Sequence, residues 1–543
     1  MPKIRSRKRV RDQALHAHWD SLDDAVFDKL GISREALKAA QVRFQGTLIL
    51  PGQPGYDDAR MLKNPVFNPM PSLIALCQTE ADVAYALGLS NANGIPFTVR
   101  SGGHCTAGFS GGLGILIDVR QLKQIDVNPL TRIATVGAGA WFSELNQVLD
   151  GYGLHVPGGE CDDVCIGGFV QGGGLGFTST TYGMSCDNVI QMRVMLADGS
   201  IVVADDGTNY DLWWAMRGGT GGNFGVLLSV QYRLYPMDQV TGIALAWPLQ
   251  NSGQISWAVA ALGVLQNQYM VGTGAPDQLT LQVLLVYQTI LDPNQLPLNQ
   301  AIPVMMIRGL WVGDRASGIA AMKPLMAMPG CVTQFIVTDT YPKVLEALLD
   351  SPQSQPITPQ GLPYEDKASR YVARDLTVSE WMSVLQYFVS SPPNQMVYMY
   401  LEIYGGAIAR FPVEQSAFVH RDVHFNAVLD VFWYLPAERK ANEDYLNGWI
   451  QLMQTLWNNG VYQNYCSINV PDYPKNYWGP ALPGLVKVKN KYDPGHRFTF
   501  AQQVPYVLPS PVLEGTVPPA VAKALAEPID RAGGTPLARR RAA

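Results

Sequence analysis

The sequence predicts a mixed α/β protein with two main domains. Its 543 residues exceed the usual size of a single domain. Between about residues 42 and 240, short β-rich runs alternate with helical segments and glycine-rich loops, as is typical of α/β domains. Beyond residue 240 glycine becomes rarer and longer segments follow, so we expect a second domain to begin there. Residues 528–543 have the composition of a disordered tail.

Composition and charge exclude several classes of protein. Apolar residues make up 47% of the chain and charged residues 16%, and the glycines lack a three-residue period, so disorder and a collagen helix are excluded. The net charge of −5 provides no general attraction to nucleic acid or anionic lipid. The basic N-terminus is followed by Asp20, Asp23 and Asp24, so we interpret it as a solvated helix or fraying tail. A small substrate is therefore expected, with no nucleic-acid or membrane partner.

The sequence shows no pattern typical of a targeting peptide, a membrane-spanning helix or a metal site. It contains no run of 18 apolar residues, and no apolar stretch follows the N-terminal charges, so we expect a cytoplasmic protein. The seven cysteines are odd in number and lack paired C-x-x-C spacing, which favours reduced thiols over a disulfide framework or a zinc site.

Local signals define individual elements. In the first domain we expect strands over 46–50 and 227–234, and a helix from Glu80 to about residue 92 that begins at a capping box of Thr79 and Asp82. The N-terminal extension is predicted to contain one or two amphipathic turns. The second domain is expected to contain helices over 254–267 and 376–390 and a strand over 279–286.

One further strand, over 397–404, has an unusual face. A two-residue period places Tyr398, Tyr400, Glu402 and Tyr404 on one side and only apolar residues on the other. Three tyrosines around one carboxylate are more typical of a ligand-binding face than of a solvated sheet surface, although the local pattern leaves both open.

Two glycine clusters dominate the first domain. Arg100-Ser-Gly-Gly-His104 ends a strand, and a second run extends from Gly167 to Gly176. Such loops can surround phosphate oxygens with backbone N–H groups, although glycine more often marks a tight turn. Neither cluster is a Walker loop, and neither begins a Rossmann unit, so a nicotinamide site is not expected.

Further motifs occur with these loops in one order: Pro51 to Arg60 precedes them, and Tyr182-Gly-x-x-x-Asp-Asn188, Trp214 to Gly225, Leu485 to Lys489 and Gln502 follow. This order, over about residues 42–506, resembles the berberine-bridge-enzyme-like branch of the vanillyl-alcohol-oxidase flavoprotein superfamily. The resemblance implies a two-part PCMH-type FAD-binding domain plus a substrate domain with an antiparallel sheet backed by helices. It divides the chain into an extension (1–41), an FAD domain (42–240), a substrate domain (241–455), a segment returning to the FAD domain (456–510) and a tail (511–543).

The resemblance also implies FAD as the cofactor, attached covalently through His104 and Cys161. Cys165, four residues on, is the alternative thiol, and the match of Val164 and of the following glycine pair favours Cys161. The remaining FAD-binding positions implied by the motifs are Arg100, Ser101, Gly102, Gly103, Val164, Gly167, Gly168, Gly172, Gly173, Gly174, Gly176, Asn188, Asn223 and Gly225.

Oxidation of an alcohol carbon needs a hydride acceptor and a base for the hydroxyl proton. The Asn464-Tyr465 pair resembles the position at which family members carry a catalytic tyrosine, so Tyr465 is the predicted base, provided that its neighbours lower its pKa. Glu402 is predicted to assist, Tyr182 to lie near the flavin, and Tyr398, Tyr400, Tyr404 and Asn426 to contact substrate. In a strand expected over 420–433, Val428 replaces the carboxylate of alkaloid-cyclising members, which makes that chemistry unexpected.

The function expected from these residues is oxidation of an alcohol or lactol carbon of a sugar, oligosaccharide or glycosylated metabolite. Val164, three residues after Cys161, resembles the valine of family oxidases, whereas family dehydrogenases carry isoleucine there, so we expect O2 as acceptor and H2O2 as product. The alternatives are a dehydrogenase with another acceptor, a flavin-binding protein without turnover, and a nicotinamide-fed flavin reductase.

Overall fold

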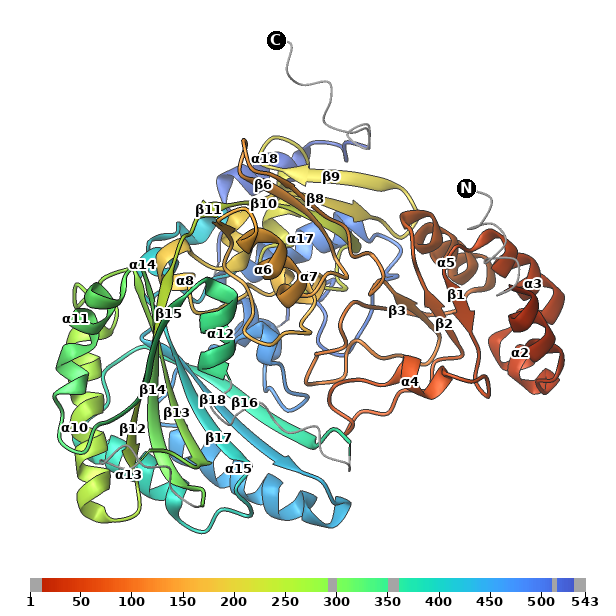
Figure 1. The fold of residues 1–543 in the computed structure, drawn as a ribbon. Coiled ribbons are helices and arrows are strands. Elements are labelled where there is room, and N and C mark those ends of the chain that lie inside the picture. The colour runs from red at the N-terminus through yellow and green to blue at the C-terminus, as the bar shows by residue number, and fades with distance from the viewer. Residues whose placement is uncertain (1–11, 292–299, 350–360, 510–514, 532–543) are drawn as a thin grey trace.

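The structure is a computed structural model that describes residues 12–291, 300–349, 361–509 and 515–531. Over these ranges the chain forms a mixed α/β fold, as predicted, with sheets of four, five, two and seven strands (Figure 1). None of the described helices is both long enough and apolar enough to cross a membrane.

The four-stranded sheet begins the first domain. Its spatial order is β1 (Thr47–Ile49), β2 (Leu73–Leu76), β4 (Ile115–Asp118) and β3 (Phe97–Arg100), with β2, β4 and β3 parallel. Helix α5 (Glu80–Asn93) carries the predicted capping box, in which the Thr79 hydroxyl and the Asp82 carboxylate each accept a backbone N–H bond. Both sides of this sheet are buried. Leu73 and Ile115 pack with α5 and the N-terminal helices, whereas Ile74 and Leu116 on the other side pack against Tyr56 of α4 (Tyr56–Arg60).

The N-terminal extension is more regular than predicted. Residues 12–20, α2 (Asp24–Leu30) and α3 (Arg34–Arg43) are helical, and Trp19, Phe27 and Leu37 join the first-domain core. Burial of these three apolar side chains stabilises the packing of the extension on the sheet.

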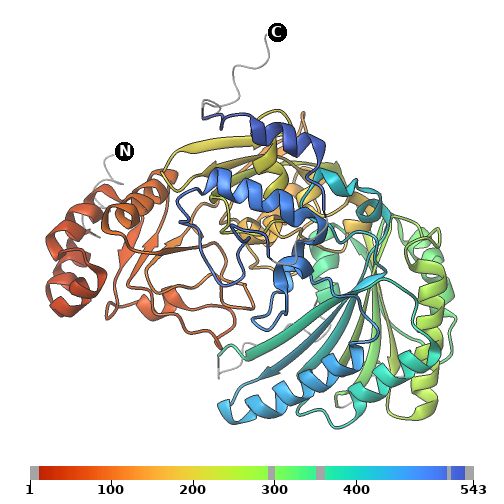
Figure 2. The same cartoon turned by 180° about the vertical axis from the view of Figure 1, so that it is seen from behind.

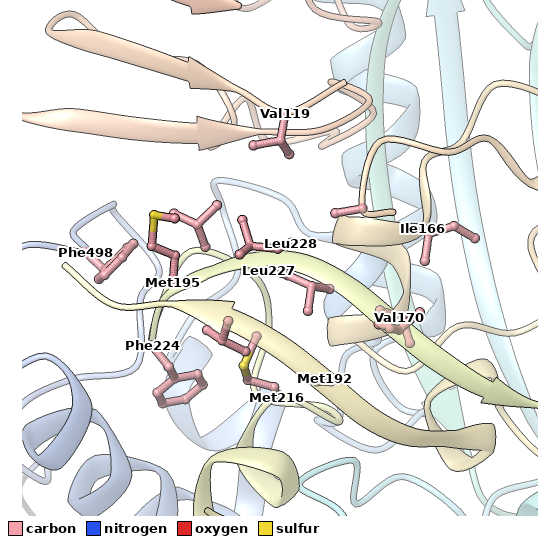
Figure 3. Packing of buried hydrophobic residues seen from close by; sticks show 14 of the residues in the cluster. Val119, Ile166, Val170, Met192, Met195, Met216, Phe224, Leu227, Leu228 and Phe498 are labelled. Carbon is pink, nitrogen blue, oxygen red and sulfur yellow. The ribbon is translucent and has the colours of Figure 1, made fainter. Parts of the chain in front are cut away.

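The five-stranded sheet is antiparallel and completes the first domain. Its order is β5 (Ile125–Asn128), β6 (Ile133–Gly137), β10 (Val226–Arg233), β8 (Val189–Met195) and β9 (Ile201–Asp205). Figure 3 shows Ile166 and Val170 of α7 (Ile166–Gln171) beside Leu227 and Leu228 of β10. The remaining helices of this domain are α4 (Tyr56–Arg60), α6 (Phe142–Asp150), α8 (Ser179–Tyr182), η1 (Ser185–Asn188) and α9 (Tyr210–Ala215), and its two-stranded sheet joins β7 (Leu154–His155) to β11 (Tyr235–Pro236).

The second domain is built on a seven-stranded antiparallel sheet. The strands, in spatial order, are β15 (Val332–Asp339), β12 (Val240–Pro248), β14 (Ile302–Val312), β13 (Leu279–Gln288), β17 (Val397–Ile403), β18 (Phe425–Trp433) and β16 (Tyr364–Val372). One face is covered by α10 (Ser252–Tyr269), α11 (Arg315–Met326), α13 (Val378–Val389) and α15 (Arg439–Met453), whereas α12 (Tyr341–Leu349) lies on the other side, toward α6 (Figure 1). Apolar residues of alternate positions pack under the outer helices, which leaves the opposite face of β17 and its neighbours directed at the first domain.

The strand predicted over 420–433 begins later than expected. β18 starts at Phe425, because the Arg421 guanidinium turns instead to Asp187 of the first domain, with contacts of 2.7 and 2.9 Å to its two carboxylate oxygens. Helix α14 (Gly406–Arg410) and η2 (Val413–Gln415) precede this contact, and η3 (Pro436–Glu438) follows the strand.

The chain then returns to the first domain. It passes through η4 (Gln463–Tyr465), α16 (Tyr473–Trp478), η5 (Gly479–Ala481) and α17 (Leu482–Tyr492), which lie against the first-domain strands (Figure 2). The buried Lys489 ammonium donates hydrogen bonds to Asp493 (2.9 Å) and to the carbonyls of Asn223 and Phe498 (both 2.6 Å). Part of the predicted tail is also ordered, since residues 519–526 form α18 (Pro519–Ala526), whose Val521 is buried.

Candidate active site

A cavity of about 1160 Å³ lies between the first-domain loops and the inner face of the seven-stranded sheet. The first domain contributes residues 101–106 and 159–169, the sheet contributes side chains of β13, β14 and β16–β18, and the returning chain contributes residues 462–466. The first domain, the seven-stranded sheet and the returning chain thus meet around one space large enough for a cofactor and a substrate.

His104 stands on the first-domain wall of this cavity. It follows Gly103, whose φ of +75° is the left-handed conformation that glycine adopts without strain. Its Nε2 lies 2.9 Å from Oδ1 of Asp163, and Lys63 pairs with the other oxygen of the same carboxylate. The close His104 imidazole, and then Lys63, holds the pKa of Asp163 well below its usual range, so Asp163 remains ionised beside the ring.

The two candidate thiols differ in accessibility. Cys161 is exposed to the cavity, although its distance from bulk water raises its thiol pKa to about 11. Cys165 is 3% exposed, its Sγ lies 3.4 Å from the Gly139 carbonyl, and burial raises its pKa to about 12. A molecule in the cavity therefore reaches Cys161 more easily.

Tyr465 of the returning chain and Glu402 of β17 form a hydrogen-bonded pair at another part of the cavity wall. The Tyr465 hydroxyl, which lines the cavity, donates to Glu402 Oε1 at 2.6 Å, and the Asn426 amide donates to Oε2 at 2.9 Å. Strand register produces this arrangement, because Glu402 of β17 lies directly opposite Asn426 of β18. Glu402 itself stands behind Tyr465 and is 5% exposed.

Burial changes the proton affinities of this pair. Burial, and then the nearby Glu160 carboxylate, raises the pKa of Glu402 to about 7. Burial, and then Glu402, raises the pKa of Tyr465 well above 10, which is opposite to the lowered pKa expected from the sequence. Tyr465 is therefore a phenol at neutral pH, and Glu402 is the group of the pair that titrates there.

A lysine approaches the same phenol. Lys367 Nζ lies 5.1 Å from the centre of the Tyr465 ring and is paired with Asp430 (2.9 Å) and Glu365 (2.7 Å). Burial opposes its charge, but these two carboxylates keep its pKa well above the ordinary value. Lys367 is therefore a cation at the cavity wall, close enough to favour negative charge on Tyr465.

The tyrosine face of β17 is only partly directed at the cavity. Tyr398 and Tyr400 line it, and Tyr400 meets Tyr465 edge to face at 6.1 Å. Tyr404 lies beyond the end of the strand, where it is 1% exposed and its hydroxyl is 3.2 Å from that of Tyr371. The structure thus assigns Tyr404 to the core, and Asn426 contacts Glu402 rather than the cavity.

Several implied FAD-domain positions are structural in this molecule. The Arg100 guanidinium is buried and donates to Asp118 at 2.6 and 2.9 Å, away from the cavity lining. Tyr182 stacks on Tyr235 with ring centres 4.3 Å apart, and Asn188 accepts a 2.8 Å bond from the Tyr235 hydroxyl. The structure does not bring Tyr182 to the other catalytic candidates.

The predicted glycines and their neighbours separate into two groups. Ser101, Gly102, Gly103, Val164, Gly167, Gly168 and Gly225 line the cavity. Gly172, Gly173, Gly174 and Gly176 instead allow close packing, and a Cβ at Gly172 would lie 2.1 Å from Asn464. The Asn223 side-chain N–H donates to the Thr220 hydroxyl, and the Asn223 side-chain oxygen accepts the N–H of Val504 of the returning chain at 2.7 Å.

The sequence did not point to several polar groups of the cavity, namely Glu160 of the first-domain loop and Gln282, Arg308, Glu365 and Lys367 of the sheet. Glu160 and Gln282 are 3.4 Å apart, and Glu160 is 4.0 Å from Arg308. Lys367 lies opposite Asp430 of the neighbouring strand and forms an ion pair with it, and this strand pairing is visible only in three dimensions.

Comparison with known proteins decides which family this architecture belongs to. Residues 71–205 match the family model described as FAD binding domain, and residues 461–505 match the model described as berberine and berberine like. The chain is a berberine-bridge-enzyme-like FAD-linked oxidoreductase. The match to the FAD-binding model lies within its first domain, and its mixed α/β fold with a large antiparallel sheet is like that of the BBE-like proteins.

Relatives of this oxidoreductase span nearly its whole length. An uncharacterized FAD-linked oxidoreductase, YgaK, of Bacillus subtilis is 26% identical over 475 residues, which cover 86% of this chain and 98% of YgaK. A carbohydrate oxidase of Microdochium nivale is 28% identical over 506 residues, covering 87% and 95%. A xylooligosaccharide oxidase of Thermothelomyces thermophilus is 26% identical over 464 residues, covering 80% and 87%.

Solved structures agree with this assignment of the fold. The BBE-like 1 protein of Physcomitrella patens superposes with a TM-score of 0.76 at 22% identity, over 87% of this chain and 99% of that one. A grass pollen allergen with glucose dehydrogenase activity superposes with a TM-score of 0.72 at 20% identity, over 84% and 96%.

The cavity of this oxidoreductase fits FAD. Glycines line its first-domain wall, and a Cβ built at Gly168 would meet only one protein atom within 4 Å, the Ser101 hydroxyl at 4.0 Å, so the cavity comes close to the backbone there. Phe109 and Phe500 add apolar surface, with ring centres 5.5 Å apart, and His104 and Cys161 supply an imidazole and a thiol. This donor set suits a flat heteroaromatic cofactor with a phosphate-bearing chain.

Proposed function

We propose that this oxidoreductase is an oxidase that acts on an alcohol or lactol carbon of a sugar, oligosaccharide or glycosylated secondary metabolite, with O2 as acceptor and H2O2 as product. The observation that carries the proposal is the Tyr465–Glu402 hydrogen bond of 2.6 Å at the wall of a wide cavity that also contains charged and amide side chains. The carbohydrate and xylooligosaccharide oxidases among the relatives support a sugar as substrate.

The protein's role in the reaction is to remove the hydroxyl proton. FAD, when bound, supplies the acceptor for the hydride that leaves the substrate carbon. As the carbon loses hydride, its hydroxyl becomes acidic and gives its proton to Tyr465 Oη, while Tyr465 passes its own proton to Glu402 Oε1. The ammonium of Lys367, 5.1 Å from the ring centre, stabilises negative charge that develops on the phenol during this relay.

Tyr398 and Tyr400 provide aromatic surface on the sheet side of the cavity, opposite the FAD-domain wall. Such surface packs well against the C–H faces of sugar rings, while Glu160, Gln282 and Arg308 offer hydrogen bonds to hydroxyl groups. This combination favours a hydroxyl-rich substrate over a wholly apolar one.

A panel of mono-, oligo- and glycosylated alcohols, each mixed anaerobically with the enzyme, tests the function. Bleaching of the flavin absorbance identifies a substrate, and subsequent admission of air should release one H2O2 per flavin. If no member of the panel bleaches the flavin, the proposal of alcohol oxidation is contradicted.

Doubly covalent attachment of FAD through His104 and Cys161 belongs to the same proposal, since Cys161 is the thiol exposed to the cavity. We expect the acid-precipitated protein to stay yellow. Cys161→Ala should retain flavin through His104 alone, whereas the matched Cys165→Ala variant should keep both links, as measured by mass spectrometry of flavin peptides. Release of all flavin into the acid supernatant would refute the attachment, and the reverse pattern of the variants would assign the link to Cys165.

Oxygen access provides a separate prediction at Val164, a half-buried residue of the cavity wall. Val164→Ile adds one methylene to a close-packed wall, so we expect reoxidation by O2 to slow about tenfold while anaerobic reduction by substrate stays nearly unchanged. Stopped-flow absorbance measures both steps.

Val170→Ile is the control for this experiment. Val170 of α7 is fully buried (Figure 3) and lies outside the cavity lining, so the same added methylene should cost about 1–3 kcal/mol of stability and leave reoxidation unchanged. If the wild-type enzyme reoxidises with quinones or dyes but not with air, it is a dehydrogenase. This is the principal alternative, because one structural relative has glucose dehydrogenase activity.

A further inference from the structure

Two cysteines that the proposed reaction does not use lie side by side in the cavity. Cys105 follows His104 in the first domain, and Cys466 follows Tyr465 in the returning chain, 361 positions later. Their Sγ atoms are 3.5 Å apart, both residues line the cavity, and both thiols are free. The fold therefore brings together two thiols, one directly after His104 and the other directly after Tyr465.

The two thiols differ in acidity. The two sulfurs share a hydrogen bond, and this contact with Cys105 is the main cause that lowers the pKa of Cys466. Burial opposes the shift, whereas the Ala107 backbone N–H and the Thr106 hydroxyl add to it. The same bond, with burial, raises the pKa of Cys105. All seven cysteines lie in the described ranges, and Cys466 alone has a lowered pKa.

Such a pair has the features of a redox site. A thiolate is the form of cysteine that attacks peroxide, and a neighbouring thiol converts the resulting sulfenic acid to a disulfide before further oxidation. A disulfide has an S–S distance of about 2.05 Å, so the two sulfurs need to approach by about 1.5 Å, a movement that side-chain rotation can supply.

We propose that Cys105 and Cys466 are a modification site at which hydrogen peroxide forms a reversible disulfide across the active-site cavity. The Cys466 thiolate attacks one oxygen of H2O2, so that an S–O bond forms, the O–O bond breaks and the other oxygen leaves as hydroxide, which takes up a proton to give water. The Cys105 sulfur then attacks the Cys466 sulfur, the S–O bond breaks, and the departing hydroxide leaves as water with the Cys105 proton. Two thiols lose two electrons, and one peroxide becomes two waters.

Because Cys105 and Cys466 line the active-site cavity, peroxide for forming the disulfide could come from the enzyme's own reaction. Peroxide made at the flavin would be released into the cavity that Cys466 lines, close to Tyr465, before it reached bulk solvent. This supply rests on the proposed oxidase function, whereas the disulfide itself requires only peroxide from any source.

The experiment uses the flavin-loaded enzyme, reduced with dithiothreitol, desalted without oxygen and treated with excess H2O2 in the absence of substrate. Alkylation under denaturing conditions followed by peptide mapping should show loss of two alkylatable thiols and a cross-linked peptide joining Cys105 to Cys466, which dithiothreitol reverses. The matched Cys331→Ser variant, whose cysteine lies outside the cavity lining, should form the same cross-link.

Two variants separate the roles of the thiols. Cys466→Ser should lose the cross-link. Cys105→Ser should accumulate a sulfenic acid at Cys466, and dimedone should trap it at least tenfold faster than any oxidation product at Cys331. The inference is overturned if the wild-type enzyme keeps both thiols alkylatable after peroxide, or if peroxide joins another pair.

Turnover in air, with and without catalase, tests the source of oxidant independently. Formation of the cross-link during turnover supports supply from the reaction. A cross-link that forms with added peroxide but never during turnover leaves the modification site intact and contradicts the local supply of peroxide.

Discussion

Replacement of Tyr465 by Phe is expected to slow anaerobic reduction of the flavin by about 100-fold, the lower end of the contribution of a positioned proton-transfer group. The variant keeps the ring, and with it the edge-to-face contact with Tyr400 at 6.1 Å, but it loses the hydroxyl that joins the cavity to Glu402 at 2.6 Å. The substrate hydroxyl then lacks a path for its proton. Stopped-flow measurement of the limiting reduction rate, at saturating substrate, reports this loss.

Tyr445→Phe is the matched control, because it also removes one buried tyrosine hydroxyl. That hydroxyl donates to the Phe388 carbonyl at 3.0 Å, between two outer helices, and has no place in the cavity lining. We expect Tyr445→Phe to lower stability slightly and to leave the reduction rate within about twofold of wild type. Equal reduction rates in Tyr465→Phe and wild type would move the base to Glu402 or to another group.

The fold was predictable where the chain carries local signals. The capping box of Thr79 and Asp82, the alternation in 227–234 and the β-rich run at 279–286 each identified an element that the structure contains, because such signals depend on neighbours in sequence. The late start of β18 was not predictable, since the ion pair of Arg421 with Asp187 joins residues 234 positions apart.

The sequence pointed to several residues that the structure places at or beside one cavity, but not to the contacts between them. The sequence identified Tyr465, Glu402 and His104, yet it expected a lowered pKa at Tyr465, and the structure gives the opposite because the phenol is buried beside a carboxylate. Strand pairing accounts for the residues that were missed. Lys367 acquires its role from the register that sets it opposite Asp430, and no local pattern encodes that register.

Glycine motifs show the same limit. Gly168 and Gly172 belong to one run, but the first borders the cavity and the second accommodates Asn464. Gly172 has no room for a Cβ, whereas Gly168 leaves its backbone open to the cavity, and the sequence alone assigns both the same role. A resemblance in motif order therefore located the FAD wall as a whole without separating its cofactor contacts from its packing contacts.

The pH dependence of the reaction is expected to follow Glu402, whose pKa is raised to about 7, chiefly by burial. Tyr465 can pass its proton on only while Glu402 is ionised, so the limiting rate of flavin reduction should rise about tenfold per pH unit below 7 and become constant above pH 8. Glu402→Gln removes the acceptor. We expect the rate at pH 8 to fall by at least tenfold and the dependence between pH 6 and 8 to disappear.

The same pKa predicts an effect on stability. Glu402 is protonated in both states below about pH 4.5, but at higher pH the unfolded chain ionises first, so its contribution to stability decreases as pH rises through about 7. The difference between about 7 and the ordinary 4.5 corresponds to on the order of 3 kcal/mol. Denaturant unfolding of the flavin-loaded enzyme should therefore show that Glu402→Gln gains stability relative to wild type between pH 5 and 8.

Glu380→Gln distinguishes this effect from a general consequence of removing a carboxylate. Glu380 caps α13, and its pKa of about 2, lowered chiefly by Arg374, keeps it ionised in the folded protein throughout the measured range. Its replacement should lower stability by a similar amount at pH 6 and pH 8 and leave the kinetic profile unchanged. If the profile of Glu402→Gln still rises through pH 7 with the wild-type slope, the relay through Glu402 is wrong, because the titrating group is then elsewhere. A flattened profile with an unchanged rate at pH 8 would instead show that Glu402 sets the protonation of Tyr465 without accepting its proton.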